Sequence, residues 1–322
     1  WLDDGEVTPE YFGTDIVTGQ LIKIWSGFIE IHVTADVAFG AWQYYICSGD
    51  QEFMDRCGYE LILDCAKFWA SRLEPGEDGL LHINDVVGPD EYKEHVNDNA
   101  FTNYMARWNI QKAIEYAELL QKDRPALYAE LDAKLGISSL LPEWKEKVLR
   151  IFLTQPTENG ILPQDATYLT LPEVDLSKYR SQAHVGGIYK DYNQEQINSI
   201  QVSKQADVMV LFYLLEELFP QEVKRASYYD VVQFIIKDCN DAIDCPDLPF
   251  RITSSGENRR MSKSLAWAIK SRMSLYAASP LYNEGNNYWK EAYDINKAAL
   301  NALESNGFKL YDKINIPGTW NV

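Results

Sequence analysis

The chain has 322 residues, enough for about two domains of ordinary size. With 46% hydrophobic and 24% charged residues, it is not a disordered, collagen-like or low-complexity chain. The net charge of −18 argues against a nucleic-acid partner, because phosphates repel an acidic surface, and no apolar run approaches the roughly 20 residues that span a bilayer.

The first residues of the chain, from Trp1 to Gly5, contain no initiator Met and no basic segment before an apolar stretch. No signal peptide is therefore predicted, and the chain is expected to be a fragment of a longer protein. Its five cysteines are an odd number without a CxxC pair, which indicates neither a disulfide framework nor a zinc site. We expect them to be free and mostly buried, in a reducing compartment.

The first part of the chain is predicted to be mainly helical. Helices are expected over residues 30–46 and 51–72, and the short turn between them makes them antiparallel neighbours. Residues 75–90 contain Pro-Gly and Gly-Pro pairs that predict a loop. Residues 100–121 carry apolar side chains on two faces, which predicts a helix packed on two sides.

An irregular segment and further helices follow. Residues 154–198 are rich in Pro, Gly, Asn and Asp, and loops of this length are often functional. Residues 206–219 are apolar nearly all round and predict a buried helix. Three amphipathic helices are then expected from apolar stripes over residues 228–239, 265–276 (ended by Pro280) and 289–303.

The charge is distributed unevenly along the chain. Residues 228–322 contain 11 acidic and 11 basic residues, so the whole net charge of −18 lies in residues 1–227. Such a shift in charge indicates a domain boundary near residue 227.

The most polar stretch, Val86 to Asn99, lies between two predicted helices. In a cleft lined by aromatic residues, burial and the neighbouring Asp90 would disfavour the charged form of Glu91, as a general acid requires. Glycosidic cleavage needs such an acid, because the leaving oxygen must be protonated. On spacing alone, an Asp-Glu pair after Gly-Pro is more often the N-terminus of a helix, where it complements the helix dipole.

Other candidate residues have two interpretations each. Lys204 and Gln205 precede a buried helix, where a lysine usually extends its ammonium group to solvent. They could instead offer an ammonium and an amide to sugar hydroxyls or phosphate at a cavity mouth. Glu91 and His95 have the spacing of a metal-ligand pair, but no third ligand lies nearby, so no metal is predicted and a solvated helix turn is expected.

Aromatic side chains could stack on sugar rings, but each of the following is expected in the core instead: Trp25, Trp42, Trp69 and Trp108.

Five blocks in the first part of the chain match a known family in order. They are EIHVTADVA (30–38), FWASR (68–72), GPDEY (88–92) running into NDNAFTN (97–103), NGILPQD (159–165) and KQADV (204–208). On these blocks, residues 1–227 resemble glycoside hydrolase family 65, which contains the inverting phosphorylases of maltose, kojibiose, nigerose and trehalose.

The resemblance implies an all-α fold with an incomplete (α/α)6 barrel over residues 1–227. It implies that Glu91 is the general acid and that Lys204 and Gln205 bind the glucose whose anomeric carbon reacts. The loop over residues 18–25 would line the pocket for the acceptor sugar.

The implied reaction is the phosphorolysis of an α-linked glucose disaccharide to β-glucose 1-phosphate, with inversion. Inorganic phosphate is then the co-substrate and nucleophile, so no cofactor is expected and one carboxyl group suffices, whereas hydrolysis uses a second carboxylate. A family 65 hydrolase stays the alternative, and the linkage is left open. The resemblance is compatible with a homodimer and with a cytoplasmic or periplasmic enzyme.

Two segments of the family are missing from the chain, a Phe-Trp-Asp segment that grips the donor glucose and a His-Ser-Ser-Leu-Ser segment that binds phosphate. The chain by itself is therefore expected to be inactive. A partial barrel is also expected to expose apolar helix faces.

The last part of the chain carries a second set of blocks, FIIKDCNDAI (234–243), RMSK (260–263) and AWAIKSRMSLYAASP (266–280). On these, residues 228–322 resemble part of a SusD/RagB nutrient-uptake protein, which implies a tetratricopeptide-like helical segment, an outer-membrane location for its parent and a partner transporter. The chain is interpreted as two incomplete segments, joined by a natural fusion or an artefact. A glycan-binding uptake protein is the alternative function.

Overall fold

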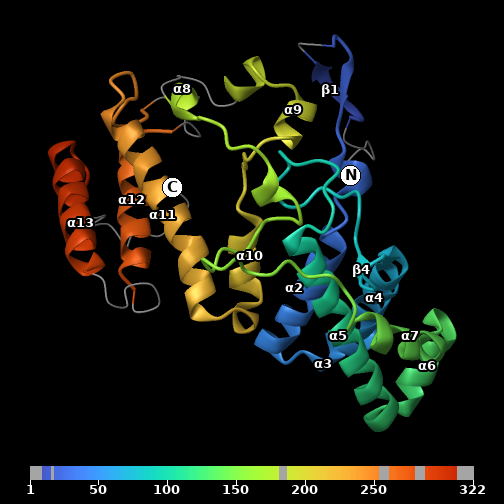
Figure 1. The fold of residues 1–322 in the computed structure, drawn as a ribbon. Helices are drawn as coiled ribbons and strands as arrows, with labels where there is room; N and C mark the ends of the chain where they lie inside the picture. The colour runs from blue at the N-terminus through green and yellow to red at the C-terminus, as the bar shows by residue number, and fades with distance from the viewer. Residues whose placement is uncertain (1–8, 16–17, 181–186, 254–260, 280–286, 310–322) are drawn as a thin grey trace. The chain divides into compact units, whose positions relative to one another are not determined.

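The computed structural model describes residues 9–15, 18–180, 187–253, 261–279 and 287–309. The described residues are mostly helical, as predicted, and divide into two compact units (Figure 1). Unit 1 comprises Trp1–Asp175 and His184–Pro220, and unit 2 comprises Leu176–Ala183 and Gln221–Val322. Residue 227 lies within a helix of unit 2, and the domain boundary predicted there stays a prediction.

Four helices make the core of unit 1. Helices α2 (Val33–Ser48), α4 (Tyr59–Arg72) and α5 (Ala100–Asp123) pack against one another in all three pairs, and α10 (Asp207–Leu214) packs on α5 (Figure 1). The side chain of Asn99 caps α5 by accepting a hydrogen bond from the Thr102 N–H group, at 3.0 Å. The prediction that the helix over residues 100–121 packs on two sides is confirmed by α5.

The other elements of unit 1 are shorter. Two antiparallel pairs of strands are present, β1 (Tyr11–Thr14) with β2 (Leu21–Lys23) and β3 (Glu74–Pro75) with β4 (Leu81–His82). The short helices are α1 (Ser26–Ile29), α3 (Gln51–Phe53), α6 (Pro125–Leu135), α7 (Ile137–Lys147) and α9 (Gln194–Asn198). One π-helical turn, η1 (Met54–Gly58), and three 3-10 turns, η2 (Tyr168–Thr170), η3 (Gly187–Lys190) and η4 (Glu216–Leu218), complete the set.

Several predicted elements differ from the structure. The predicted helix over residues 51–72 is interrupted by the π-helical turn η1. The helix predicted over residues 206–219 ends at Leu214, and Tyr213 is 78% exposed, because α10 packs on α5 with one side only. Helices α6 and α7 were not predicted, although Pro125 begins α6 and Gly136, with a φ of 75°, ends it.

Unit 2 contains α8 (Ser177–Arg180) and three longer helices, α11 (Gln221–Asp244), α12 (Lys263–Ala277) and α13 (Tyr288–Ser305). The three pack in chain order, α11 on α12 and α12 on α13 (Figure 1). The apolar stripe predicted along α13 is wrong in part, because three of its residues are exposed to solvent: Trp289, Tyr293 and Leu300. The small residues Ala292 and Ala299 are the buried ones in this part of the described chain, where α13 packs mainly on α12.

Two other predictions for this unit lie outside the described residues. They concern the side chains of residues 228–234 in the predicted stripe of α11, and Pro280 as the end of α12.

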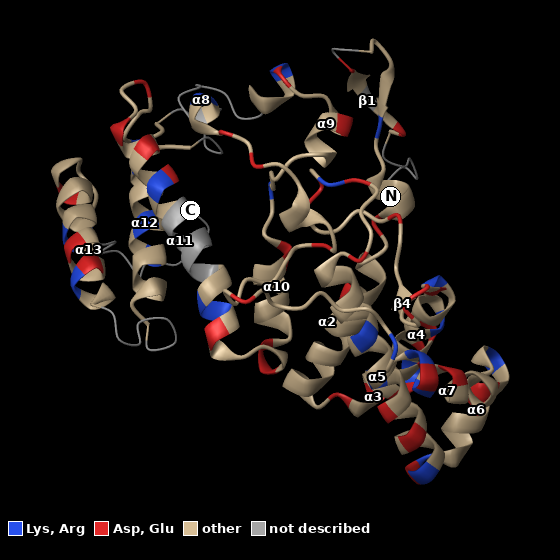
Figure 2. Cartoon of the chain, in the orientation of Figure 1, with Lys and Arg blue, Asp and Glu red and all other residues tan. Residues whose placement is uncertain are grey.

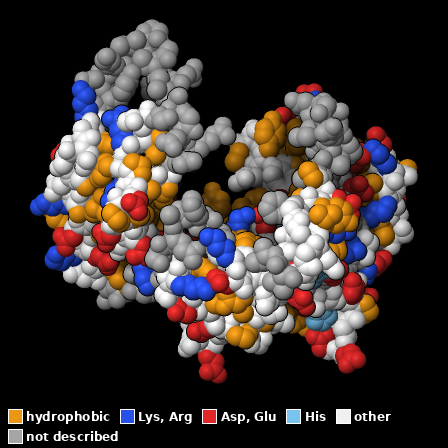
Figure 3. Space-filling view, turned by 90° about the horizontal axis from the view of Figure 1, so that it is seen from above, with side chains coloured by type: hydrophobic (Ala, Val, Ile, Leu, Met, Phe, Trp, Pro, Cys, Tyr) orange, Lys and Arg blue, Asp and Glu red, His pale blue; other side chains and the backbone are white. Residues whose placement is uncertain are grey.

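Charged residues of both signs lie along α6 and α7 (Figure 2). Some tie these helices to the core, as when Lys134 of α6 pairs with Glu60 of α4 at 2.6 Å. Figure 3 shows hydrophobic, acidic and basic side chains interspersed on one face of the molecule. On α2, Val33, Val37 and Tyr44 are about half exposed, which confirms for this helix the expected exposure of an apolar face.

All five cysteines are free, as predicted, but the expectation that most are buried is wrong, because only Cys239 is buried. Among the described residues, no helix has both the length and the apolar character needed to cross a membrane.

Leu63 of α4 is fully buried among the core helices of unit 1. We expect Leu63→Ala to lower the free energy of unfolding by about 2–5 kcal/mol, because it removes buried methyl groups and leaves a cavity. Urea unfolding followed by circular dichroism measures this change. Leu149→Ala is the matched control, since Leu149 is 77% exposed and its truncation should change stability by less than about 0.5 kcal/mol. Equal effects of the two variants would contradict the packing described.

Candidate active site

The polar stretch between β4 and α5 forms a loop closed at its base. Val86 and Val96 exchange backbone hydrogen bonds of 3.0 and 2.9 Å. Further from the tip of the loop, the Asp98 N–H group donates to the Ile83 carbonyl at 2.9 Å. The expectation that Glu91 and His95 lie on a helix turn is wrong, because the backbone of this stretch is a loop and His95 has a φ of 57°.

The carboxylate of Asp90 is buried at the centre of the loop's contacts. Its Oδ1 atom accepts hydrogen bonds from the backbone N–H groups of Tyr92 (3.2 Å), Lys204 (2.9 Å) and Gln205 (3.3 Å). Its Oδ2 atom accepts a bond of 2.8 Å from Nε2 of Gln164. One side chain thus joins three segments that are far apart in the sequence.

This junction brings the three predicted site residues together. The Nζ atom of Lys204 lies 2.5 Å from Oε2 of Glu91, and the two side chains are 46% and 47% exposed. The hydrogen bond to Glu91 raises the pKa of Lys204. Gln205 follows directly, and its Oε1 atom is buried without a hydrogen-bond partner in the structure. The expectation that Glu91 is desolvated is wrong, since its side chain is half exposed and paired with a cation.

Glu91 also borders a pocket of about 500 Å³. One wall comes from the end of the β1–β2 hairpin and the residues after it, including Ile22, Ile24 and Trp25. The rest of the lining includes Tyr189 and Gln194. Part of the loop expected to line an acceptor-sugar pocket therefore lies at the same pocket as Glu91.

The four tryptophans considered as sugar-stacking residues are in different places. Trp69 is fully buried and Trp108 is nearly so, which confirms core packing for these two. Trp42 is only partly buried, although its ring centroid lies 5.4 Å from that of Trp108. Trp25 instead lines the pocket, with its ring centroid 4.4 Å from that of His95.

A buried lysine holds the segment around α9 to the loop. The Nζ atom of Lys93 donates hydrogen bonds to the backbone carbonyls of Ile197 (2.8 Å), Asn198 (3.2 Å) and Ile200. Burial lowers the pKa of Lys93, while the negative charges of nearby carboxylates oppose this change. In addition, Nε2 of Gln194 donates to the Tyr92 carbonyl at 3.0 Å. The loop and the segment around α9 are therefore joined by side-chain hydrogen bonds.

A second carboxyl group, that of Glu94, lines the same pocket. Its backbone N–H group donates to Oδ1 of Asn198 at 2.9 Å. Burial raises the pKa of Glu94 to about 7, against the opposing effect of His95. Burial thus makes this carboxyl group a weaker acid than an exposed glutamate.

The glycine of the GPDEY block lies against buried polar groups. A Cβ atom at Gly88 would lie 2.4 Å from Nδ2 of Asn99 and 2.6 Å from Oδ2 of Asp207. These two side chains share a hydrogen bond of 2.8 Å, and burial raises the pKa of Asp207 to about 7 although that bond lowers it. Only glycine leaves room for this pair.

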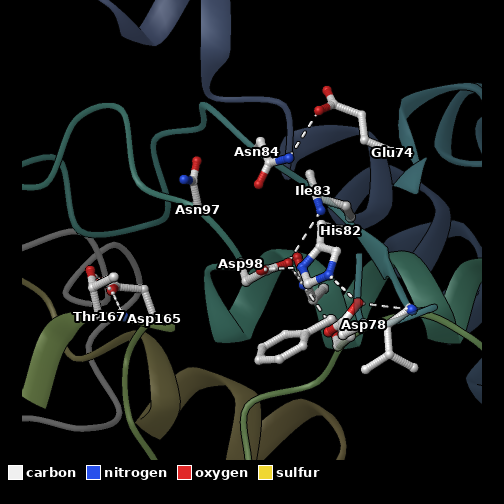
Figure 4. Close-up of polar contacts among 12 residues, drawn as sticks. Glu74, Asp78, His82, Ile83, Asn84, Asn97, Asp98, Asp165 and Thr167 are labelled. Atoms are coloured by element: carbon white, nitrogen blue, oxygen red, sulfur yellow. Dashed lines mark hydrogen bonds and ion pairs between the residues drawn. The ribbon is translucent and has the colours of Figure 1, made fainter. Parts of the chain in front are cut away.

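His82 binds two carboxylates near the base of the loop (Figure 4). The Nδ1 atom of His82 lies 2.7 Å from Oδ2 of Asp98, and its Nε2 atom lies 3.1 Å from Oδ1 of Asp78. Asp98 also accepts hydrogen bonds from the Ile83 N–H group (3.3 Å) and from Nδ2 of Asn103 (2.8 Å). Burial by itself lowers the pKa of His82, but the bonds to the two carboxylates outweigh this effect and raise it.

Sequence reasoning missed several residues of this arrangement. Asp90 and Gln164 lie in the GPDEY and NGILPQD blocks, so their positions in the sequence were a signal for a role in the site. Lys93 and Glu94 lie outside these blocks, and only their position in the polar stretch from Val86 to Asn99 was a signal. Among the described residues, no group of three His, Cys, Asp or Glu side chains is placed to hold a metal ion.

Comparison with known proteins identifies the family. Residues 2–235 match the central catalytic domain of glycosyl hydrolase family 65. The chain belongs to this family. The expected resemblance of the first part is confirmed, and the match extends past residue 227.

Similar family 65 proteins include known phosphorylases. The chain is 45% identical to the kojibiose phosphorylase of Halothermothrix orenii over 227 residues, which are 70% of this chain and 29% of that protein. It is 30% identical to the nigerose phosphorylase of Lachnoclostridium phytofermentans over 235 residues, which are 70% of this chain and 30% of that protein. The chain therefore spans less than a third of the length of these relatives.

A solved structure described as "Putative kojibiose phosphorylase from human microbiome" has a similar fold. Its TM-score is 0.56 at 22% sequence identity, and the similarity covers 85% of this chain and 33% of that one. At this identity the likeness concerns the fold alone. It agrees with the mostly helical, α/α-barrel type of architecture that was expected.

Asp207 should make stability depend on pH. Its pKa is about 7 when folded, against an ordinary value of 3.8, so between these values the folded state keeps a proton that the unfolded state has lost. The free energy of unfolding therefore falls as pH rises through this range. Asp207→Asn should weaken this fall, as measured by urea unfolding at about pH 4 and about pH 8. Asp123→Asn, at the exposed end of α5, is the control, and parallel pH profiles for Asp207→Asn and the parent would contradict the assignment.

His82 should have the opposite pH dependence. Its pKa is raised above 6.5 in the folded state, so the stabilisation is fully present below that pH and is lost as pH rises through the folded-state value. His82→Asn should therefore lower the thermal midpoint more at about pH 5.5 than at about pH 9. Asp78→Asn leaves the contact between His82 and Asp98 in place, so it should reproduce only part of the pH-dependent loss in thermal midpoint. If His82→Asn lowers the thermal midpoint equally at both pH values, the charge on His82 does not stabilise the fold.

Proposed function

We propose that the protein carrying this chain is an inverting glycoside phosphorylase that cleaves an α-linked glucose disaccharide with inorganic phosphate. Glu91 is the general acid, and Lys204 and Gln205 bind the glucose whose anomeric carbon reacts. The observation that carries the proposal is the convergence of these three residues through the Asp90 carboxylate, together with the pocket that Glu91 lines.

In the proposed reaction, a phosphate oxygen forms a bond to the anomeric carbon from the face opposite the leaving sugar. The bond from that carbon to the bridging oxygen breaks, its electron pair stays on the oxygen, and Glu91 supplies the proton that this oxygen takes up. The products are β-glucose 1-phosphate and the second sugar. One carboxyl group suffices because phosphate is the nucleophile.

The ion pair between Glu91 and Lys204 constrains the mechanism. A general acid must face the oxygen that it protonates, but here the Glu91 carboxyl group is bound to the Lys204 ammonium group at 2.5 Å. Sugar binding therefore has to separate the pair, so that Lys204 contacts sugar hydroxyls and Glu91 faces the bridging oxygen. Among the described residues, the buried Oε1 atom of Gln205 has no hydrogen-bond partner, and in the proposed complex a rotation of this side chain lets it accept a hydrogen bond from the same sugar.

The relatives support the substrate class. A kojibiose phosphorylase is 45% identical over the matched residues, and a nigerose phosphorylase is also similar, so kojibiose is the first disaccharide to test and nigerose the second. The complete (α/α)6 barrel, a homodimer and a cytoplasmic or periplasmic location belong to this proposal. The SusD/RagB-like identity of residues 228–322, with its outer-membrane parent and partner transporter, stays a prediction.

Glu91→Gln tests the acid in the natural protein that carries this chain. We expect kcat for phosphorolysis to fall by about 10²–10⁴-fold, because the amide keeps the shape of the side chain but donates no proton to the leaving oxygen. The measurement is the phosphate-dependent release of β-glucose 1-phosphate.

Glu130→Gln, on the exposed surface of α6, is the matched control and should leave the rate unchanged. Undiminished turnover in Glu91→Gln would refute the assignment of the acid. Release of glucose that does not depend on phosphate would instead identify a family 65 hydrolase.

A further inference from the structure

Glu94 has a carboxyl group for which the proposed reaction has no role. It lines the pocket that Glu91 borders, three residues further along the same loop. Within the described parts of the chain, neither a Lys nor an Arg side chain forms an ion pair with it. Its backbone N–H group donates to Asn198, and the neighbouring Lys93 donates to the Ile197 carbonyl, so the backbone that carries this side chain is held in place.

The surroundings of Glu94 suit a sugar ring. Ile22, Ile24 and Trp25 provide an apolar wall, and Tyr189 adds a second aromatic side chain. Sugars present C–H groups on their faces and hydroxyl groups at their edges, so aromatic walls with a few polar groups are the usual form of their binding sites. Gln194 contributes an amide to the same pocket.

The pocket lies on one side of Glu91. Its lining includes Glu91 and Glu94 but neither Lys204 nor Gln205. Because the proton donor has to face the oxygen between the two sugars, a ring in this pocket is the leaving sugar, and the glucose held by Lys204 and Gln205 lies on the other side of that oxygen.

We propose that Glu94 binds a hydroxyl group of the leaving sugar and so determines which acceptor the enzyme takes in the synthetic direction. This inference rests on the proposed function. Among the described residues, no group forms a hydrogen bond with the half-buried carboxyl group of Glu94, so a sugar hydroxyl can take the place of water on its oxygens. A pKa of about 7 lets the same group accept or donate that bond at neutral pH.

The test uses the natural protein that carries this chain, run in the synthetic direction from β-glucose 1-phosphate and glucose. For Glu94→Ala we expect the KM for glucose to rise about tenfold, the loss typical of one hydrogen bond to an ionisable group. The KM for β-glucose 1-phosphate should stay within about twofold, because that sugar is bound by other residues. Glu94→Gln, which keeps hydrogen bonding, should recover part of the affinity, and Glu130→Gln is the control.

Monodeoxy glucoses used as acceptors identify the hydroxyl group. One of them should be a poorer acceptor than glucose for the parent protein but equal to glucose for Glu94→Ala, since the variant has already lost that contact.

The two proposals fail in different ways. If the parent carries out phosphorolysis but Glu94→Ala leaves the KM for glucose unchanged, or raises both KM values equally, the inference is wrong and the proposed function stands. If the parent shows no phosphorolysis, or Glu91→Gln retains full turnover, the proposed function fails and the inference falls with it.

Discussion

The buried carboxylate of Asp90 is the interaction on which the site depends. A charge removed from water is tolerated only where hydrogen bonds compensate its lost hydration, and here four donors do so. Three of the donors are backbone N–H groups, which cannot rotate away as side chains can. The loop with Glu91 and the turn with Lys204 and Gln205 are therefore held at one distance from each other.

Lys93 extends the same principle to the pocket. It is a buried cation that donates to backbone carbonyls beyond α9, while Asp90, three residues before it, is a buried anion that accepts from backbone N–H groups. Each ion is solvated by peptide dipoles, and their opposite charges favour one another across the loop. The loop thus has fixed contacts on both sides, and Glu91 and Glu94 project from it into a preformed pocket.

Asp207 and His82 make the stability of the site depend on pH, because their surroundings affect their charged forms in opposite ways. Asp207 is buried beside Asn99 with one oxygen unpartnered, so its charged form is disfavoured. His82 lies between two carboxylates, so its charged form is favoured. As pH rises towards neutrality, the first group destabilises the fold, and at higher pH the second loses its stabilising charge. The loop should therefore be held most firmly in mildly acidic solution.

The sequence by itself determined the family, the helix over residues 100–121 and the identity of Glu91, Lys204 and Gln205 as candidates, because these depend on local periodicity and on short ordered blocks of residues. It did not determine that Glu91 is half exposed and paired with Lys204, that the apolar residues of α13 face solvent, or that Glu94 lines the pocket. Only the tertiary structure decided these points, since burial, pairing and pocket walls come from segments about one hundred residues apart that meet through Asp90 and Lys93.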